Sequence, residues 1–308
     1  MPLIQVNAIG DTPCLHGSGA EPLHAEDLVT ARGPAVIMIH GYKFLPGDAR
    51  HCPHRHILSL DTTRACWKAL SWPRHLGFGR GNPGEGLAVA FGWSARGSIW
   101  RAYDEAAQAG HALARLIEML KAAAPDRPVH ILAHSLGAKV ALRALSALDA
   151  PLVQRVILMA GAEFAGHAEA ALTSPAGRAA EVVNVTSREN DLYDFLLESL
   201  IAAPKSGDRT ISHGLAEAAR CVTLQLDDPE TLGTLAGLGF PIAPPARRVC
   251  HWSGYLRPGV FPLYQALLRR PETLPIDLLR TRLPETPHPR WSRLWPAAPQ
   301  PRPLQAAQ

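Results

Sequence analysis

The sequence predicts an α/β fold in which a mostly parallel sheet is covered by helices on both faces. Two observations lead to this expectation. Short apolar runs of strand length, several of them rich in Val and Ile, recur along the 308 residues, and segments with apolar side chains at helical spacing lie between them. Strands that alternate with helices are typical of parallel sheets, and a run that is apolar at nearly every position indicates a strand buried on both faces.

The first half of the chain contains three such strands and one long helix. Strands are expected at residues 35–39, 87–93 and 129–134, which read Ala-Val-Ile-Met-Ile, Leu-Ala-Val-Ala-Phe-Gly-Trp and Val-His-Ile-Leu-Ala-His. Between the second and the third, residues 101–124 carry apolar side chains at helical spacing until Pro125 ends the pattern. A helix of small residues is expected directly after the third strand.

The second half of the chain continues the alternation. Further strands are expected at residues 155–160, 181–187 and 221–226, followed by a helix over residues 260–268. Residues 1–283 are expected to form a single domain with a loop or cap insertion at residues 43–86. Residues 284–308 are rich in proline, so we expect an extended or disordered tail.

A candidate nucleophile lies where the third strand ends. Residues 129–137 form an apolar run that stops at Ser135, which small residues flank. This pattern is typical of a nucleophile elbow, a sharp turn from strand to helix that exposes a serine hydroxyl. The usual G-x-S-x-G pattern is altered here because Ala133 replaces the first glycine, while Gly137 is the second. The alternative is a helix that begins at a capping serine.

Two backbone amides are expected to form an oxyanion hole beside this serine. The strand at residues 35–39 ends in His40-Gly41-Tyr42, and the N–H of Tyr42 is the first expected donor. The N–H of Leu136, which follows the nucleophile, is the second. The alternative for the first segment is a buried strand followed by an ordinary glycine turn.

An acid is expected after a later strand, because this type of fold orders its residues as Ser, Asp or Glu, then His. Asp191 lies just beyond the strand at residues 181–187 and is the first candidate. It would hold the imidazole in the productive tautomer and stabilise the imidazolium. Asp194 is the second candidate and Glu163 is the third. Each is alternatively a charge at a helix N-terminus.

The general base is expected to be His251. This histidine follows the last strand and a loop, and it precedes the helix at residues 260–268. His213, which lies before the last strand, is the alternative. His134 and His40 are next to the motifs, but we expect them to be hydrogen-bonded core residues.

The segment at residues 43–86 is long for a loop in a compact domain, and such loops are often functional. It carries the aromatic residues Phe44, Trp67, Trp72 and Phe78. We expect part of it to cover a substrate pocket lined by Phe44 and by Trp93. The alternative is that these aromatic residues form a small satellite core.

These motifs together resemble a known group of proteins. The segments are His40-Gly41-Tyr42, Phe91-Gly92-Trp93 followed by Arg96-Gly97-Ser98, Ala133 to Gly137, and Ser187 to Asp191. The sequence resembles a group of bacterial α/β-hydrolases of uncharacterised function, which is similar to the lipases and esterases but distinct from them. The likeness covers roughly residues 33 to 270. It implies an α/β-hydrolase fold, a Ser-His-Asp triad, acyl transfer and no cofactor, but no particular substrate.

The expected function is therefore that of a serine hydrolase, which cleaves a carboxylic ester or a related acyl substrate through an acyl-enzyme on Ser135. Two other classes stay open. The first is an acyltransferase that uses the same triad, and the second is a non-catalytic binding protein with the same fold. The expected partner is a small-molecule acyl ester.

Composition argues against several other functions. The net charge is +4 and the arginines are scattered, so no basic stripe indicates nucleic-acid binding. No segment reaches the ~18 apolar residues of a membrane span. The five cysteines are odd in number and widely spaced, so a disulfide framework is not expected. The amino end lacks the pattern of a signal peptide, and a cytoplasmic location is the default expectation.

Two further segments match ligand-binding motifs only in part. Residues 79–84 read G-x-G-x-x-G, but they contain Pro83 and precede a strand, whereas a dinucleotide fingerprint follows a strand and opens a helix. Residues 51–56 contain three histidines and one cysteine, but Pro53 interrupts them and the spacing of a structural zinc site is absent. We expect neither a cofactor nor a metal.

Overall fold

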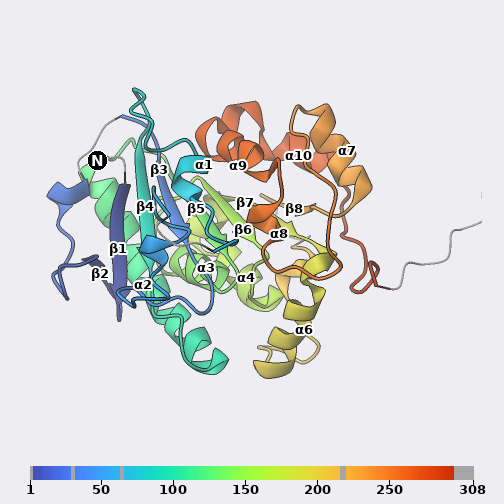
Figure 1. Cartoon of the computed structure of the whole chain (residues 1–308), viewed down its shortest axis with the longest axis horizontal. Coiled ribbons are helices and arrows are strands. Elements are labelled where there is room, and N and C mark those ends of the chain that lie inside the picture. The colour runs from blue at the N-terminus through green and yellow to red at the C-terminus, as the bar shows by residue number, and fades with distance from the viewer. Residues whose placement is uncertain (1–2, 29–31, 63–65, 216–219, 295–308) are drawn as a thin grey trace, which may run out of the picture.

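The computed structural model describes residues 3–28, 32–62, 66–215 and 220–294. In these ranges the chain forms an eight-stranded sheet with the order β2-β1-β4-β3-β5-β6-β7-β8 (Figure 1). The strands are β1 (Leu3–Ile9), β2 (Thr12–Leu15), β3 (Ala35–Ile39), β4 (Leu87–Gly92), β5 (Val129–His134), β6 (Arg155–Met159), β7 (Glu181–Thr186) and β8 (Cys221–Gln225). Only β1 and β2 pair antiparallel in the described sheet, so the prediction of a mostly parallel sheet is confirmed.

The helices follow the strands in sequence. The α-helices are α1 (Trp72–His75), α2 (Ile99–Ala123), α3 (Gly137–Ala147), α4 (Ala165–Leu172), α5 (Pro175–Ala179), α6 (Asp191–Leu200), α7 (Pro229–Gly237), α8 (Ser253–Leu256), α9 (Val260–Arg269) and α10 (Ile276–Arg282). The described residues also form five 3₁₀ turns: η1 (Ala25–Leu28), η2 (Pro53–Arg55), η3 (Arg188–Asn190), η4 (Ile211–His213) and η5 (Pro271–Thr273). None of the described helices is long and apolar enough to cross a membrane.

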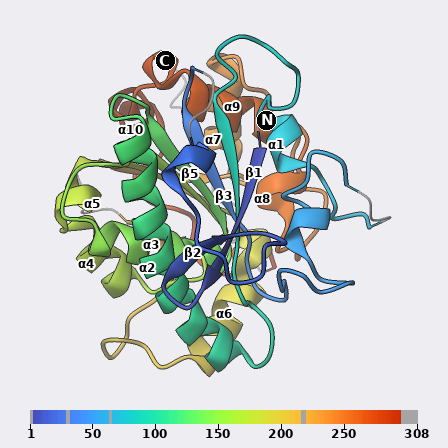
Figure 2. The same ribbon diagram turned by 90° about the vertical axis from the view of Figure 1, so that its left-hand side faces the viewer.

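Two apolar layers hold the helices to the sheet. One core packs α2, α3 and α4 against alternate strand residues such as Ile37, and the other packs α1 and α9 against the residues between them, such as Met38. Figure 2 shows the sheet from its β2 edge, with α2 to α5 on one side of it and α1 and α8 on the other. Both faces of the central strands are therefore buried, which explains why their sequences are apolar at nearly every position.

Helix α2 begins two residues earlier than the apolar spacing indicates. The hydroxyl of Ser98 accepts a hydrogen bond from the N–H of Arg101 at 3.2 Å, so Ser98 is the N-cap. A serine in this position satisfies one of the free N–H groups of the first helical turn.

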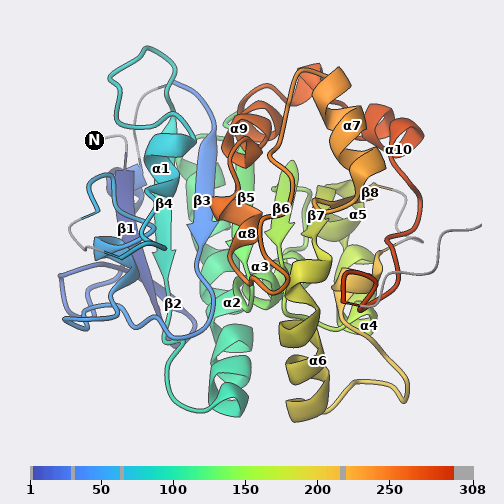
Figure 3. The same ribbon diagram turned by 45° about the vertical axis from the view of Figure 1, so that its right-hand side comes forward.

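Strand order determines which loops meet at the carboxyl end of the sheet. Strand β3 pairs directly with β5, and Ile39 lies opposite Ala133. The loop that begins at His40 is therefore next to the turn that begins at His134. Figure 3 shows α8 near the middle of the sheet, beside β5 and β6.

The segment at residues 43–86 divides between core and surface. Trp72 and Phe78 are fully buried in the core that faces α9, whereas Trp67 is 57% exposed. Trp67 meets Trp252 edge to face at 5.4 Å, and Trp252 comes from the loop before α8. Trp72 and Phe78 thus belong to one of the two main cores instead of a separate satellite core, and Trp67 lies beside the loop that carries His251. Its role as a cap stays a prediction.

The beginning of the proline-rich tail lies against the domain. The N–H of His288 donates to Oε1 of Gln225 at 2.6 Å, and the N–H of Trp291 donates to Oδ2 of Asp191 at 2.6 Å. Residues 284–294 therefore follow the β8 edge without regular secondary structure. The rest of the expected tail, residues 295–308, lies outside the described residues.

Candidate active site

Ser135 occupies a strained turn between β5 and α3. Its φ is +55°, in the left-handed region that non-glycine residues rarely adopt. The turn is held from β6, because Ser135 N–H donates to the carbonyl of Met159 and the carbonyl of Ser135 accepts from the N–H of Ala162, both at 3.0 Å. Gly137 is required here, since a Cβ at that position would lie 2.8 Å from the carbonyl oxygen of His40.

The imidazole of His251 reaches this serine from the loop that precedes α8. The Ser135 hydroxyl donates to Nε2 of His251 at 2.9 Å. The backbone of His251 is fixed by His134, whose Nε2 lies 3.0 Å from the carbonyl oxygen of His251. Burial lowers the pKa of His134 to about 4, so this ring is neutral at pH 7 and donates its Nε2–H.

The other nitrogen of the His251 ring faces an amide. Nδ1 of His251 lies 2.6 Å from Oδ1 of Asn190. An amide oxygen can only accept, so Nδ1 carries the proton and Nε2 presents its lone pair to Ser135. Burial lowers the pKa of His251 well below its usual value, and the neighbouring His134 ring and the Lys68 ammonium lower it further. The neutral tautomer that the hydrogen bonds require is therefore the state favoured at pH 7.

Behind Asn190 lies a buried carboxyl group. Nδ2 of Asn190 donates to Oδ1 of Asp194 at 2.9 Å. Asp194 is 2% exposed, and burial raises the pKa of its carboxyl to about 7 although the charges of Arg188 and Arg290 lower it. The hydrogen bonds thus continue from Ser135 through the imidazole and the amide to a carboxyl group.

Asp191, the first candidate for the acid, is not placed beside the imidazole. Its Oδ2 accepts from the backbone N–H of Trp291, and its Oδ1 lies 3.3 Å from Nη1 of Arg188. Successive residues of a helical turn point about 100° apart, so Asn190 and Asp191 face different partners. Asp194 lies four residues after Asn190 and shares its face.

His213, the alternative base, and Glu163, the third candidate for the acid, also lie outside this chain of hydrogen bonds. His213 is exposed at the end of η4, and none of its described hydrogen bonds involves Ser135. Glu163 is buried with other partners, since its carboxylate lies 3.1 Å both from Nζ of Lys139 and from Nδ1 of His167. Of the two histidines named for the base, only His251 is brought to the serine.

The loop after β3 packs directly on the nucleophile. A Cβ at Gly41 would lie 2.6 Å from Cβ of Ser135, so only glycine fits. Nδ1 of His40 lies 2.9 Å from the carbonyl oxygen of Gly41, while Nε2 accepts from the N–H of Trp93 at 3.1 Å. Among the described residues, the amides of Tyr42 and Leu136 have no hydrogen-bond acceptor.

The two residues expected to line a substrate pocket have different positions. Trp93 is fully buried, its indole N–H donates to the carbonyl oxygen of His40 at 3.0 Å, and its ring stacks on that imidazole. It therefore supports the loop after β3 instead of facing a substrate. Phe44 is half-buried, and its ring lies 5.1 Å from that of His40 and 5.3 Å from that of His56.

Several residues near His251 have no motif that could reveal them from the sequence. The Tyr193 ring stacks on the imidazole at 4.5 Å, and the Trp252 ring lies 6.0 Å from it. Asn190 lies in the turn from Ser187 to Asp191, one of the segments that carry the resemblance to α/β-hydrolases. The spacing of four residues between Asn190 and Asp194, at the start of a helix, is the one signal that could have identified this pair.

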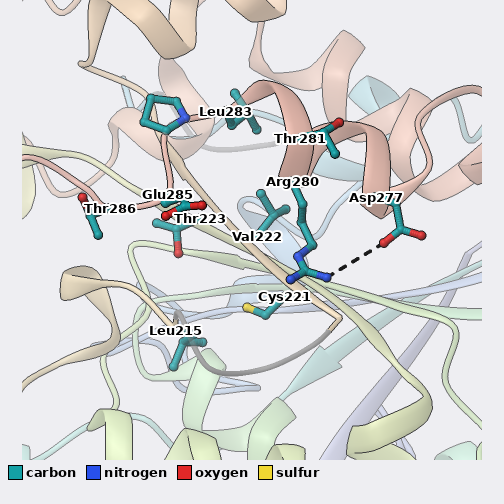
Figure 4. Close-up of a pocket in the computed structure, with 11 residues that line it drawn as sticks. Leu215, Cys221, Val222, Thr223, Asp277, Arg280, Thr281, Leu283, Glu285 and Thr286 are labelled. Carbon is teal, nitrogen blue, oxygen red and sulfur yellow. Dashed lines mark ion pairs between the residues drawn. The ribbon is translucent and has the colours of Figure 1, made fainter.

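A cavity of about 480 Å³ lies elsewhere, at the amino end of β8 (Figure 4). It is lined by Cys221, Val222 and Arg280, among others, and Arg280 points toward Asp277. The strands are parallel here, so this end of the sheet is opposite to the end that carries Ser135. The cavity does not belong to the candidate active site.

The parallel sheet with a serine elbow after β5 and a histidine loop after β8 defines the α/β-hydrolase fold, as the resemblance in sequence implied. The family described as "Alpha/beta hydrolase of unknown function (DUF900)" matches residues 31–161. This match is less than half of the 308 residues, and it includes β3, β5 and the Ser135 elbow. The chain is thus a member of the α/β-hydrolase superfamily.

Other comparisons give weak similarities. No curated protein matches the sequence. A Trichoderma reesei cutinase, solved in complex with a C11Y4 phosphonate inhibitor, is 15% identical over 48% of this chain and 59% of the cutinase, with a TM-score of 0.25. A Lactobacillus plantarum WCFS1 protein described as a "putative cell surface hydrolase" is 13% identical over 52% of this chain and 70% of its own, with a TM-score of 0.31. Similarity at this level supports no conclusion about function.

Proposed function

We propose that the chain is a serine hydrolase that cleaves a carboxylic ester, or a related acyl substrate, through an acyl-enzyme on Ser135. The observation that carries this proposal is the 2.9 Å hydrogen bond between the Ser135 hydroxyl and Nε2 of His251. It joins a serine with a positive φ to a histidine that is 116 positions later in the chain. A hydroxyl paired with a neutral imidazole is the arrangement that activates a serine nucleophile.

The reaction would proceed in two halves. His251 Nε2 removes the hydroxyl proton while Ser135 Oγ bonds to the carbonyl carbon, and the carbonyl oxygen becomes an oxyanion. The imidazolium then gives its proton to the departing alkoxide as the ester bond breaks. In the second half, water attacks the acyl-enzyme, His251 accepts the water proton, and the acid product leaves as Ser135 regains its hydrogen.

In this proposal Asn190 takes the position of the triad acid. Its Oδ1 accepts the Nδ1–H of His251, which fixes both the tautomer and the orientation of the ring. An amide carries no charge, so it cannot stabilise the imidazolium as a carboxylate does. The carboxylate of Asp194, held on the far side of the same amide, would supply that charge from a greater distance.

The N–H of Tyr42 and the N–H of Leu136 would stabilise the oxyanion. The Gly41–Tyr42 peptide is trans, and its carbonyl is bonded to the His40 ring. Because the carbonyl and the N–H of a trans peptide point in opposite directions, the N–H of Tyr42 points away from that ring. Gly41 lies against Ser135, so this donor is held close to the reacting carbonyl.

Activity-based labelling provides the direct test. Purified protein is treated with a fluorophosphonate probe, and the modified residue is identified by peptide mass spectrometry. We expect the probe on Ser135, no labelling of Ser135→Ala, and strongly slowed labelling of His251→Ala. Loss of the hydrogen bond to Nδ1 in Asn190→Ala is expected to lower kcat for 4-nitrophenyl butyrate by about a hundredfold to ten-thousandfold.

The same assay separates the proposal from its alternatives. A protein that leaves Ser135 unlabelled and hydrolyses no ester would contradict the proposal and favour a binding role. Labelling of Ser135 together with preferential transfer of the butyryl group to an added alcohol, instead of water, would identify an acyltransferase.

A further inference from the structure

A group of cations and aromatic rings adjoins His251. Nζ of Lys68 lies 3.4 Å from the centre of the Trp252 ring and 5.2 Å from that of Trp67. The guanidinium of Arg247 lies 4.9 Å from the centre of the Trp67 ring. We name Lys68, Trp67, Trp252 and Arg247 the cationic stack. It reaches the proposed base directly, because Trp252 follows His251 in the chain and its ring is 6.0 Å from the imidazole.

A third cation is close to this stack. Lys43 follows Tyr42 in the loop after β3, and its exposed side chain lies near enough to lower the pKa of Lys68. Lys68 in turn lowers the pKa of His251. Lys68 is therefore close enough to interact electrostatically with both Lys43 and His251.

No carboxylate balances these charges in the described part of the chain. Neither Lys43, Lys68 nor Arg247 forms a side-chain ion pair there. Glu189 is nearby and accepts from the backbone N–H of Arg247, but its carboxylate is paired with Arg257. The stack thus presents uncompensated positive charge.

The physical state of Lys68 indicates what kind of group would bind. Partial burial lowers the pKa of its ammonium, which means that the charge has lost some of its hydration. The Trp252 face replaces part of that loss through a cation–π contact. A cationic ligand would find these ring faces already occupied and would be repelled, whereas an anion would restore a charge partner for the ammonium.

We propose that the cationic stack binds an anionic group of the substrate, so that the preferred esters carry a carboxylate or a phosphate close to the scissile carbonyl. This inference rests on the proposed function of Ser135. Lys68 holds the anion through an ion pair, and Lys43 and Arg247 add long-range attraction.

Matched esters test the inference. The first pair is 4-nitrophenyl butyrate and 4-nitrophenyl hemiglutarate, which have the same leaving group but differ by a carboxylate on the acyl chain. The second pair is phenyl butyrate and 4-carboxyphenyl butyrate, which place the charge on the alcohol side. We expect kcat/KM to be at least about tenfold higher for the charged member of one pair, which then identifies the side on which the anion lies.

Variants of Lys68 test whether the cationic stack causes the preference for charged esters. Lys68→Met keeps the length and the apolar stem but removes the charge, and we expect the charged-to-neutral ratio of kcat/KM to fall by about tenfold. Lys68→Arg keeps the charge and is expected to retain most of the ratio. Lys205→Met, a change at an exposed lysine in the loop after α6, is the matched control and leaves the ratio as it was. Raising NaCl from about 0.05 to about 0.5 M should weaken the preference of the unmodified protein.

The outcomes separate this inference from the function on which it rests. Hydrolysis of the neutral esters without a preference for either charged partner would refute the anion subsite and leave the proposed function intact. A preference that survives in Lys68→Met would also refute it. Failure to hydrolyse any of the four esters, with Ser135 unlabelled, would refute both.

Discussion

Replacement of Asp194 by asparagine is expected to make the protein more stable and less active at the same time. Burial raises the pKa of this carboxyl from its ordinary value of 3.8 to about 7, against the opposing effect of Arg188 and Arg290 and with a smaller contribution from Asp191. Between these two pH values the folded chain holds a proton that the unfolded chain has released. The contribution of Asp194 to the unfolding free energy therefore falls as the pH rises from about 4 to about 7, and it changes no further above pH 7.

The size of this change in unfolding free energy follows from the two pKa values of Asp194, in the unfolded and in the folded chain. Each pH unit between them corresponds to about 1.4 kcal/mol, so the ionised carboxylate of Asp194 costs at most about 4 kcal/mol of unfolding free energy at pH 8. An asparagine has nearly the same shape and its amide oxygen can still accept from Asn190. Asp194→Asn should thus remove most of this cost at pH 8 and change stability little at pH 4.

The effect on activity has the opposite sign. Two hydrogen bonds, of 2.6 and 2.9 Å, and the width of the Asn190 amide separate the Asp194 carboxylate from the imidazole. At a separation of about 7 Å and an effective dielectric constant of about 20, two unit charges of opposite sign attract each other by about 2 kcal/mol. Removal of this charge should lower kcat about thirtyfold at pH 8. In the unmodified protein, kcat should rise with pH through about 7 as Asp194 ionises, and Asp194→Asn should lack this rise.

Urea unfolding at pH 4.5 and pH 8 and the pH profile of 4-nitrophenyl butyrate hydrolysis measure the two effects. Asp126→Asn, at an exposed turn, is the matched control and should alter neither. The double variant Asn190→Asp/Asp194→Asn places the carboxylate directly against Nδ1 of His251 and should recover most of the lost activity. Unchanged kcat in Asp194→Asn would contradict the electrostatic role of this carboxylate, and lower stability than the parent at pH 8 would contradict its raised pKa.

Three other substitutions test the surroundings of the site. Gly41→Ala would place a Cβ 2.6 Å from Cβ of Ser135. We therefore expect kcat/KM for 4-nitrophenyl butyrate to fall about a hundredfold or more. Activity within a few-fold of the parent would argue against the close packing of this loop. Trp93→Phe removes the donor to the buried carbonyl of His40 and should lower the free energy of unfolding in urea by about 1–3 kcal/mol. An unaltered unfolding midpoint would contradict this expectation. Asp191→Asn replaces a carboxyl whose pKa is raised by burial, although the charge of Arg188 lowers it. It should therefore not lower stability at pH 8, and kcat should stay within about threefold of the parent; a loss of kcat as large as that of Asn190→Ala would return Asp191 to the triad.

The sheet could be predicted from the sequence because its central strands are buried on both faces. Residues 35–39 and 129–134 are apolar or small at nearly every position, and the structure forms strands with these bounds. The pairing of β3 with β5 depends on contacts between segments that are distant in sequence, and no local pattern reveals it. The antiparallel strand β2 and the short helices α4 and α5 were not expected, since their sequences are too short to show a period.

The nucleophile and its histidine could be placed from the order of elements, but the third member of the site could not. The rule that the acid is Asp or Glu directs attention to Asp191, and the choice between it and Asn190 depends on a rotation of about 100° at one residue. That rotation is set by the contact of Asp191 with Arg188 and with Trp291, which is a hundred residues away. The inward position of Trp93 has a similar origin, because its indole N–H donates to the carbonyl oxygen of His40, just after the neighbouring strand β3.

The electrostatics of the site give the amide and the cationic stack a common consequence. A carboxylate in direct contact with Nδ1 would raise the pKa of His251, but Asn190 is neutral, and burial, His134 and Lys68 all lower that pKa. The imidazolium that must form during the reaction is therefore disfavoured by the nearby ammonium of Lys68, and the attraction of Asp194 acts from a greater distance. An anionic substrate bound to Lys68 would offset the repulsion between the two cations just when the imidazolium forms. On this reasoning the charge of the substrate assists the chemical step as well as binding, and a neutral ester leaves the base in its least favourable environment.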